Sequence, residues 1–269
     1  MKKLKKFFSA IKLIVRKPAL LNLVLNDEDV NRQQVIAKYN LADGLLAVDI
    51  LDLLPNLHET IDPFCSLDGG SPPLDIALLK GLARRKKDCE YFEIGTWRGE
   101  SVANVAVVAK HCITLNLPDD EMLKTGMSKA YVDSHRFFSK NIINVTHLQH
   151  DSRTFDFSSL NKKFDLIFID GDHHYESVKL DTQHAFPLLK DESSIIVWHD
   201  YQKTPAADIR WDVLRGILDG TPAEKQHDLY HVSNTLCVIY TTQAIASKHL
   251  QPYEAPDKYF SMEITANKV

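Results

Sequence analysis

Short apolar runs alternate with helical stretches from residue 88 to residue 240, and this alternation limits the fold more than any other feature of the sequence. Such a series is typical of a mostly parallel sheet whose strands are connected by helices. The last two runs are separated by only Ser233 and Asn234, so they are expected to pair as an antiparallel hairpin. The sequence therefore predicts an α/β fold, with strands at 90–95, 112–117, 144–149, 164–170, 194–199, 228–233 and 235–240 and helices near 99–110, 128–140, 175–189 and 207–219.

The first part of the chain has a different character. Helical runs, broken by prolines and by a turn rich in glycine and proline, replace the strands. The runs are 2–16, 28–39 and 73–86, and the breaks are Pro55, Pro63 and 69–73. We therefore divide the chain into a helical N-terminal cap (1–73), an α/β domain (74–242) and a C-terminal extension (243–269).

The composition is that of a globular protein with a substantial core, because 44% of the 269 residues are hydrophobic and 25% are charged. The four cysteines show no C-x-x-C spacing, and we interpret them as reduced thiols of a cytoplasmic protein. The formal net charge is −4, and the seven Lys and Arg residues within 1–17 leave −11 on the rest of the chain. An acidic body argues against nucleic acid as a partner, since phosphate neutralisation requires a basic surface.

Residues 1–17 combine these basic residues with apolar ones at near-helical spacing and contain no acid. The pattern predicts a cationic amphipathic helix. Lys12 interrupts the apolar run that a secretory signal peptide requires, and no stretch reaches the length of a transmembrane helix. Two roles stay open: weak peripheral contact with a membrane, and packing on the protein's own body or on a second copy in a homo-oligomer, which we favour.

Residues 91–101, Tyr-Phe-Glu-Ile-Gly-Thr-Trp-Arg-Gly-Glu-Ser, hold a strand that ends in an acid and then two glycines four apart. A strand that enters a Gly-rich turn before a helix brings backbone N–H groups close to a nucleotide-like ligand. Only Gly95 and Gly99 are present, with two bulky residues between them, whereas a dinucleotide fold needs three glycines. The turn therefore suits a nucleoside better than a pyrophosphate, and Glu93 suits an α-ammonium group.

At this turn the chain resembles the class I S-adenosylmethionine-dependent methyltransferases, whose first motif is E/D-x-G-x-x-x-G-x-S. The resemblance implies that the seven predicted strands form a Rossmann-like sheet with the antiparallel hairpin at its C-terminal end. It also implies that the N-terminal helical cap covers an acceptor pocket, although a cap that only shields the sheet stays open. The residues that this resemblance assigns to S-adenosylmethionine are Glu93, Gly95, Thr96, Gly99 and Ser101.

Polar residues also follow the second and third predicted strands, at the edge where ligands bind in an open parallel sheet. Relatives in this family place an acid at the position of Asn116 to hold the ribose hydroxyls, so Asn116 departs from the pattern. An amide still hydrogen-bonds a diol, and Asp119 is the alternative contact. Asp151 stands where the relatives place an acid against the adenine amino group, although a turn aspartate is also a common helix cap.

The densest polar cluster, Asp-Gly-Asp-His-His-Tyr-Glu at 170–176, follows the fourth predicted strand. The next strand ends in His199 and Asp200, and adjacent strands place Asp170 and Asp200 side by side. Two close carboxylates repel each other unless a positive charge lies between them. A divalent ion bound through oxygen atoms is the simplest resolution.

This arrangement is similar to that of macrolide-sugar O-methyltransferases and cephalosporin hydroxylase-like proteins, which are metal-dependent. The resemblance implies that Asp170, His199 and Asp200 bind the metal, that Asp170 also contacts the cofactor, and that His173 is the base. His199 replaces an acid of these relatives. The mixed ligand set therefore admits magnesium, our first expectation, as well as manganese, iron or zinc, and a site without metal stays open.

We expect an enzyme that methylates a hydroxyl of a small molecule or sugar. The D/N-P-P-Y/F turn typical of amine-directed methyltransferases is absent, and His173 is placed to remove the acceptor proton together with Asp170 as the second catalytic residue. Side chains that either line the acceptor site or pack in the core, with packing favoured for each tryptophan, are Trp97, Arg98, Trp198, Tyr201 and Trp211. The alternatives are a non-catalytic cofactor-binding or scaffold protein and a hydroxylase-like metal protein.

Overall fold

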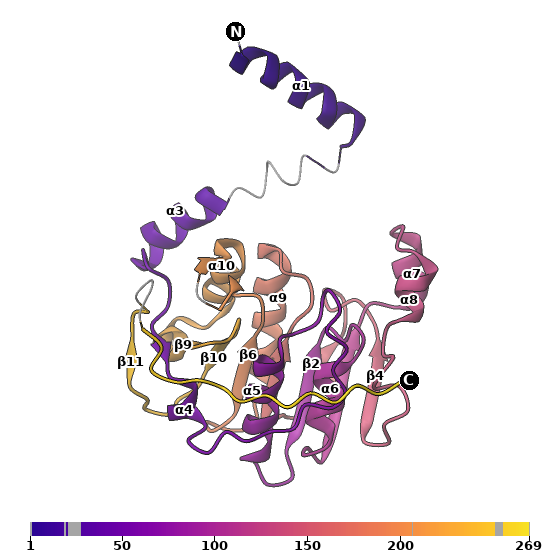
Figure 1. The fold of residues 1–269 in the computed structure, drawn as a ribbon, viewed down its shortest axis with the longest axis vertical. Helices are drawn as coiled ribbons and strands as arrows, with labels where there is room; N and C mark the ends of the chain where they lie inside the picture. Colours follow the sequence, from indigo (N-terminus) through magenta and orange to yellow (C-terminus); the bar gives the residue numbers. More distant parts are fainter. Residues whose placement is uncertain (1, 19, 21–27, 206, 251–254, 269) are drawn as a thin grey trace.

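A mostly parallel sheet runs through the centre of the computed structural model (Figure 1). The structure describes residues 2–18, 20, 28–205, 207–250 and 255–268. Nine strands of this sheet follow the order β11-β1-β9-β10-β6-β5-β2-β3-β4. Their bounds are β1 Ala47–Val48, β2 Glu90–Ile94, β3 His111–Asn116, β4 Val145–Gln149, β5 Leu166–Ile169, β6 Ile195–Trp198, β9 Leu229–Val232, β10 Val238–Tyr240 and β11 Ser247–Lys248.

Seven of these strands, β2, β3, β4, β5, β6, β9 and β10, were predicted from the sequence. Their order in the sheet and their directions confirm the Rossmann-like expectation. Strands β4, β3, β2, β5 and β6 are parallel, whereas β10 is antiparallel to both β6 and β9. The prediction missed two strands at the β9 edge: β1, from the cap, runs parallel to β9, and β11, from the extension, is antiparallel to β1. Each has only two residues, too few to show a period in the sequence.

Helices cover both faces of the sheet (Figure 1). One core cluster joins the sheet to α4, α5 and α6, and the other joins it to α9 and α10. Successive residues of a strand alternate between the two: Leu166 and Phe168 belong to the first cluster, and Ile167 and Ile169 to the second. The helices are α1 Lys2–Arg16, α3 Glu28–Tyr39, α4 Ile50–Leu53, α5 Pro73–Arg84, α6 Glu100–Ala106, α7 Asp119–Lys124, α8 Lys129–Asp133, α9 Tyr175–Ala185 and α10 Trp211–Gly220, with 3₁₀ turns η1 Phe157–Leu160, η2 Phe186–Leu188 and η3 Ala223–Asp228.

The helix predicted near 128–140 is shorter than expected, because α8 ends at Asp133. The chain beyond it turns back onto the Gly-rich segment: the backbone N–H of Arg136 donates to the carbonyl of Trp97 over 2.7 Å. The backbone of Arg136 is left-handed, with φ at 61°, which is incompatible with a continuing helix. Tertiary hydrogen bonds therefore override the helical pattern here.

The helix predicted near 207–219 also begins later than expected. Residues Gln202–Thr204 (β7) and Ala207–Ile209 (β8) pair as a separate antiparallel ribbon, and α10 starts only at Trp211. The N–H of Arg210 donates to the carbonyl of Tyr201 over 2.9 Å, so the ribbon occupies the backbone that would have formed the first helical turn.

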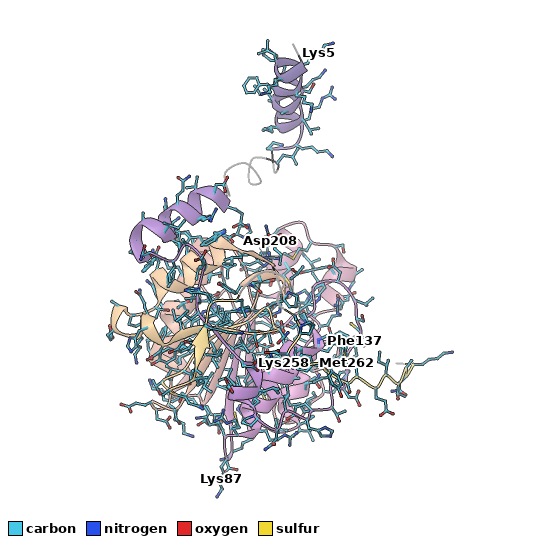
Figure 2. The ribbon with its side chains drawn as sticks, turned by 60° about the vertical axis from the view of Figure 1, so that its left-hand side comes forward. Lys5, Lys87, Phe137, Asp208, Lys258 and Met262 are labelled. Atoms are coloured by element: carbon cyan, nitrogen blue, oxygen red, sulfur yellow. The ribbon has the colours of Figure 1, made fainter. Side chains whose placement is uncertain are left out.

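The described part of the cap is tied to the body at several points. Helix α3 packs on α10, where Tyr39 donates a 2.5 Å hydrogen bond to Asp219. The loop before α5 binds α6, because the side chain of Asn104 donates to the carbonyl of Pro63 and accepts from the N–H of Asp62. Helix α1 stands apart from the body (Figures 1 and 2). Among the described residues, no helix is both long and apolar enough to cross a membrane.

Candidate active site

The Gly-rich turn between β2 and α6 has a backbone that only glycine adopts without strain. Gly95 has φ at 93° and Gly99 has φ at 80°, both in the left-handed region. A Cβ atom on Gly95 would lie 2.0 Å from the carbonyl oxygen of Asp170, so the turn packs directly on the residue that follows β5. This contact brings the predicted cofactor turn and the predicted metal cluster together.

The side chain of Glu93, in β2 just before this turn, is fully buried. The hydroxyl of Tyr91 donates to Glu93 Oε2 over 2.6 Å, while Oε1 has no hydrogen-bond partner among the described residues. Burial raises the pKa of the Glu93 carboxyl to about 8, although hydrogen bonds from Tyr91 and Ser101 act in the opposite direction. A buried carboxylate oxygen without a partner favours a cationic donor in its vicinity.

Asn116 lies at the end of β3 and faces the Gly-rich turn. Its Oδ1 accepts from the backbone N–H of Thr96 over 3.3 Å, so it braces the turn as well as flanking it. Asp119, the alternative ribose contact, is instead paired with Arg136 at 2.6 Å, and the resulting hydrogen bond lowers the pKa of Asp119. Both side chains thus have partners, since Nδ2 of Asn116 also donates to the carbonyl of Leu117 over 3.1 Å.

Asp151 lies in the turn after β4, where its carboxylate pairs with Arg153 at 2.5 Å and accepts from the Arg153 backbone N–H. The sequence had suggested a helix-capping role as one alternative, but Asp151 caps no helix here, because the next helical turn, η1, begins at Phe157 with Asp156 as its N-cap. Beneath the turn lies Asp181 of α9, only 2% exposed, and its Oδ1 has no partner among the described residues. Burial raises the pKa of Asp181 to about 7.

The metal-ligand candidates converge at the carboxyl ends of β5 and β6. One ligand atom from each of Asp170, His199 and Asp200 can be chosen so that all three lie within 4.8 Å of one another. His199 Nδ1 lies 3.1 Å from Asp170 Oδ1 and 3.7 Å from Asp200 Oδ2. Neither carboxylate lies in the direction of a ring N–H bond, so Nδ1 is a buried nitrogen without a hydrogen-bond partner among the residues described.

A third carboxylate holds the other nitrogen of the same ring. His199 Nε2 lies 3.0 Å from Oδ2 of Asp75, which is fully buried in the first turn of α5. Burial opposes the charged form of His199, but Asp170, Asp200 and Asp75 outweigh it and raise its pKa well above the ordinary value. The site therefore favours positive charge at its centre, either as a proton on the ring or as a bound cation.

His173 stands at the open side of this cluster. Its side chain is 52% exposed, and its Nδ1 lies 3.5 Å from Asp200 Oδ2. The neighbouring Asp172 and His174 are bound to each other, and Asp172 also accepts from Ser177, so they stabilise the start of α9. Of the polar residues at 170–176, Asp170 and His173 are thus the ones directed at the cluster.

Residues 92–201 match a family model described as a methyltransferase domain. The matched segment contains β2 from Phe92 onward, β3 to β6, the Gly-rich turn and the whole Asp170–His199–Asp200 cluster. This segment of the chain is therefore similar to methyltransferase domains, in agreement with the resemblance drawn from the Gly-rich motif.

Individual proteins and solved structures are also similar to this chain. Uncharacterized protein R132 of Acanthamoeba polyphaga mimivirus is 28% identical over 150 residues, which make up 51% of this chain and 62% of that protein. The chain thus spans less than two thirds of this relative's length. Among solved structures, methyltransferase PaMTH1 of Podospora anserina is similar with a TM-score of 0.46 at 19% identity, over 70% of this chain and 92% of that one. An O-methyltransferase of Bacillus cereus is similar with a TM-score of 0.44 at 14% identity, over 82% and 94% of the two chains.

The sequence analysis did not identify three residues that contact the Asp170–His199–Asp200 cluster. Asp75 holds His199, the Ser71 hydroxyl donates to Asp170 Oδ2 over 3.2 Å, and an Arg210 guanidinium nitrogen lies 3.5 Å from Asp200 Oδ1. Asp75 had one sequence signal: it is an acid within the otherwise apolar start of α5. Ser71 and Asp75 belong to the glycine- and proline-rich turn and the helix after it, so this part of the chain reaches the cluster.

The aromatic residues considered for the acceptor site are mostly structural. Trp198 is fully buried and donates from its indole to Thr182, and Tyr201 is equally buried and accepts from the Leu45 N–H. Arg98 donates to the carbonyls of the loop that precedes α5. Trp211 lies under the guanidinium of Arg32. Packing, the favoured interpretation for the tryptophans, describes Trp198 best.

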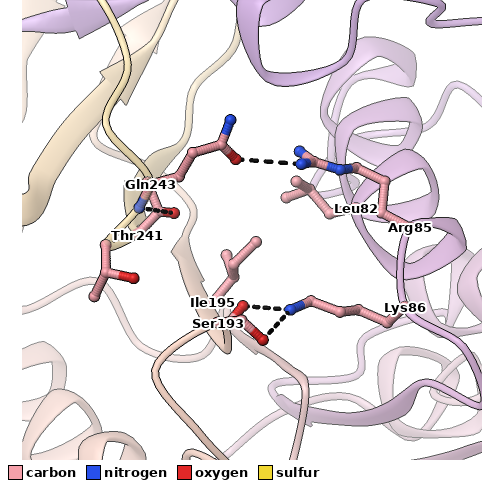
Figure 3. Close-up of a pocket in the computed structure, with 8 residues that line it drawn as sticks. Leu82, Arg85, Lys86, Ser193, Ile195, Thr241 and Gln243 are labelled. Atoms are coloured by element: carbon pink, nitrogen blue, oxygen red, sulfur yellow. Dashed lines mark hydrogen bonds between the residues drawn. The ribbon is translucent and has the colours of Figure 1, made fainter.

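A cavity of about 280 Å³ lies away from this site (Figure 3). Ile195, at the amino end of β6, contributes to it, whereas the candidate ligands follow the carboxyl ends of β5 and β6. Its polar side chains already have partners: Lys86 bonds to Ser193, and Arg85 bonds to Gln243. The cavity is lined by Leu82, Arg85, Lys86, Ser193, Ile195, Thr241, Thr242 and Gln243. We assign it no part in the reaction.

Proposed function

We propose that the protein is an S-adenosylmethionine-dependent O-methyltransferase acting on a hydroxyl of a small molecule or sugar. The observation that carries the proposal is the contact between the Gly-rich turn and Asp170. The backbone of Asp170 packs on Gly95, while its side chain belongs to the cluster with His199 and Asp200. A methyl donor held by the turn and an acceptor held by the cluster would therefore meet at one residue, as transfer between them requires.

The residues of the turn fit the proposed cofactor. The unpartnered Glu93 Oε1 offers a buried acceptor for an α-ammonium group. The amide of Asn116, which also donates to the carbonyl of Leu117 and accepts from Thr96, is proposed to bind the ribose hydroxyls. Ser101, in the first turn of α6, and the backbone of Thr96 complete the amino-acid end in this proposal. Asp151 is proposed at the adenine end, beside Ser152.

The cluster fits a divalent ion. His199 is fixed so that Nδ1 faces Asp170 and Asp200, while Asp75 occupies Nε2, which is the usual way in which a carboxylate orients a metal-binding imidazole. Two carboxylates and one imidazole suit magnesium, manganese, iron or zinc. When bound, such an ion makes an acceptor hydroxyl more acidic and holds it in place.

His173 is the proposed base. Its imidazole accepts the proton of the acceptor hydroxyl as the new oxygen–methyl bond forms, and Asp200, 3.5 Å from Nδ1, stabilises the resulting imidazolium. The half-exposed position of His173 leaves its other nitrogen open toward the acceptor side. Ser71 keeps Asp170 oriented by its hydrogen bond.

Thermal unfolding of the purified full-length protein tests the cofactor and the metal together. S-adenosylhomocysteine should raise the unfolding temperature, because a ligand that binds only the native state stabilises it by mass action. The rise should be larger in magnesium than in EDTA, and Glu93→Gln should reduce it. An unchanged unfolding temperature under all conditions would refute cofactor binding.

Metal content after purification without chelators separates the remaining alternatives. Redox-active iron bound to the protein, together with S-adenosylhomocysteine that does not bind, would favour the hydroxylase-like alternative. Cofactor binding with no methyl transfer to any hydroxyl compound of a broad acceptor screen would favour the non-catalytic one.

We further propose the cytosol as the compartment, since Cys65, Cys89, Cys112 and Cys237 are free thiols.

A further inference from the structure

Helix α1 separates its apolar and basic residues onto opposite sides. At 100° per residue, the apolar side chains fall within about a third of the helix circumference, and the basic ones occupy the rest. Leu13 is the one large apolar residue on the basic side. The apolar side carries Leu4, Phe7, Phe8, Ile11, Ile14 and Val15, and the basic side carries Lys3, Lys5, Lys6, Lys12 and Arg16.

Nothing among the described residues covers the apolar side. Phe7 and Phe8 are 58% and 62% exposed, and Val15 is 75% exposed. Figure 2 shows the side chains of α1, with Lys5 labelled, standing clear of the body. The sequence had favoured packing of this helix on the protein's own body or on a second copy, and the structure does not show the first of these. A contiguous exposed apolar surface of this kind marks an interaction site.

We propose that α1 docks on an anionic membrane surface, with its apolar side at the boundary of the acyl chains and its lysines among the lipid phosphates. Two observations select this partner. The basic residues flank the apolar stripe on both sides, which is the pattern of helices that lie in the interface plane. Residues 18–269 carry a net charge of −11, so the basic residues of 1–17 are the main source of attraction to an anionic surface.

The helix is attached on the side of the molecule that carries the candidate site. The first residue of α3, Glu28, accepts a hydrogen bond from the N–H of Trp211 over 2.8 Å. The preceding residue, Arg210, lies 3.5 Å from Asp200 of the cluster. The chain between Lys17 and Glu28 spans at most roughly 40 Å. Docking would therefore hold the cluster near the bilayer, an arrangement that suits acceptors presented at a membrane; this consequence alone rests on the proposed function.

Co-sedimentation of the full-length protein with vesicles tests the docking. The probes are vesicles of pure phosphatidylcholine and of phosphatidylcholine mixed with an equal amount of phosphatidylglycerol. We expect at least about tenfold more bound protein on the anionic vesicles, and a fall in binding as salt is added. The double change Phe7→Ser and Phe8→Ser should abolish binding, whereas Leu13→Ser, the same kind of change on the basic side, should leave most of it.

Any of three vesicle results would overturn the proposal: equal binding to both kinds of vesicle, binding that survives the double phenylalanine change, or no binding to either vesicle. A dimer in light scattering that the double change converts to a monomer would also overturn it, because it would assign the apolar side to a second copy of the chain. The unfolding temperature of each variant, which should match that of the unchanged protein, shows that the body remains folded.

Discussion

The two halves of the candidate site are built in different ways. The half proposed to bind the cofactor, called the cofactor half below, is contiguous in sequence, since Glu93, Gly95, Gly99 and Ser101 lie within nine residues of one strand, turn and helix. The half proposed to bind a metal, called the metal half below, combines three elements that are far apart in sequence: Asp75 on α5, Asp170 after β5 and His199 after β6. Asp75 and His199 are separated by 124 residues, yet they are 3.0 Å apart.

The difference also appears in how the two halves treat their buried charge. Burial raises the pKa of Glu93 to about 8, which favours its neutral form unless a cation lies nearby, and one of its oxygens accepts from the hydroxyl of Tyr91. The metal half instead places three carboxylates around one imidazole, so it is balanced by positive charge at the centre. Changes on the metal side should therefore disturb chemistry, and changes on the cofactor side should disturb binding and its pH dependence.

Asp170→Asn should have the largest effect, since Asp170 is the residue that the two halves share. We expect methyl transfer to an acceptor found by screening to fall about a thousandfold or more, because a ligand of the proposed metal and its charge are lost together. Binding of Mn²⁺, followed by electron paramagnetic resonance, should weaken in parallel. Asp165→Asn changes a buried carboxylate at the opposite end of β5 and should leave both measurements unchanged. Equal activity in the two variants would remove Asp170 from the mechanism.

His173→Gln should lower the rate of methyl transfer about a hundredfold, the usual contribution of a general base. The affinity for S-adenosylhomocysteine and for Mn²⁺ should not change, because His173 contacts the cluster only at Asp200. A full rate in the variant would show that another group takes the proton.

Asp75→Leu should weaken Mn²⁺ binding by about ten- to a hundredfold, the usual effect of losing a carboxylate that orients a ligating imidazole. Asp75→Asn keeps an acceptor for the His199 Nε2–H bond and should lose less. A general loss of stability would not produce this order, since both variants remove the same buried charge. Indistinguishable Mn²⁺ affinities for the unchanged protein and Asp75→Leu would show that Asp75 is only a packing residue.

Glu93 should produce the smallest effect, in the pH dependence of stability. Its folded pKa of about 8 lies above the ordinary 4.5, so the stabilisation is complete at pH below about 4.5 and is lost as the pH rises toward 8. The free energy of unfolding should decline by about 1 kcal/mol per pH unit between about 5.5 and 7.5, relative to Glu93→Gln. S-adenosylhomocysteine should diminish that decline, because its ammonium favours the ionised carboxylate. Parallel curves for the two proteins, without ligand, would contradict the assignment.

Much of the sheet was predictable because buried parallel strands are continuous apolar runs. Leu166–Ile169 and Ile195–Trp198 show this clearly, and each is followed by a polar residue, Asp170 or His199, that the fold places at one edge. Regions governed by hydrogen bonds from elsewhere were predicted poorly. The backbone N–H of Arg136 donates to the carbonyl of Trp97, and the N–H of Arg210 donates to the carbonyl of Tyr201. The helical patterns around these two residues therefore do not determine the local structure.

The sequence by itself determined the α/β class, the Gly-rich turn with Glu93, and the presence of acids after two neighbouring strands, because periodicity and short motifs are local properties of a chain. Only the tertiary structure decided that Asp75 orients His199, that Ser71 reaches Asp170, and that the apolar side of α1 has no cover among the described residues. Those contacts join residues far apart in the chain, and their geometry depends on how the helices pack against the sheet.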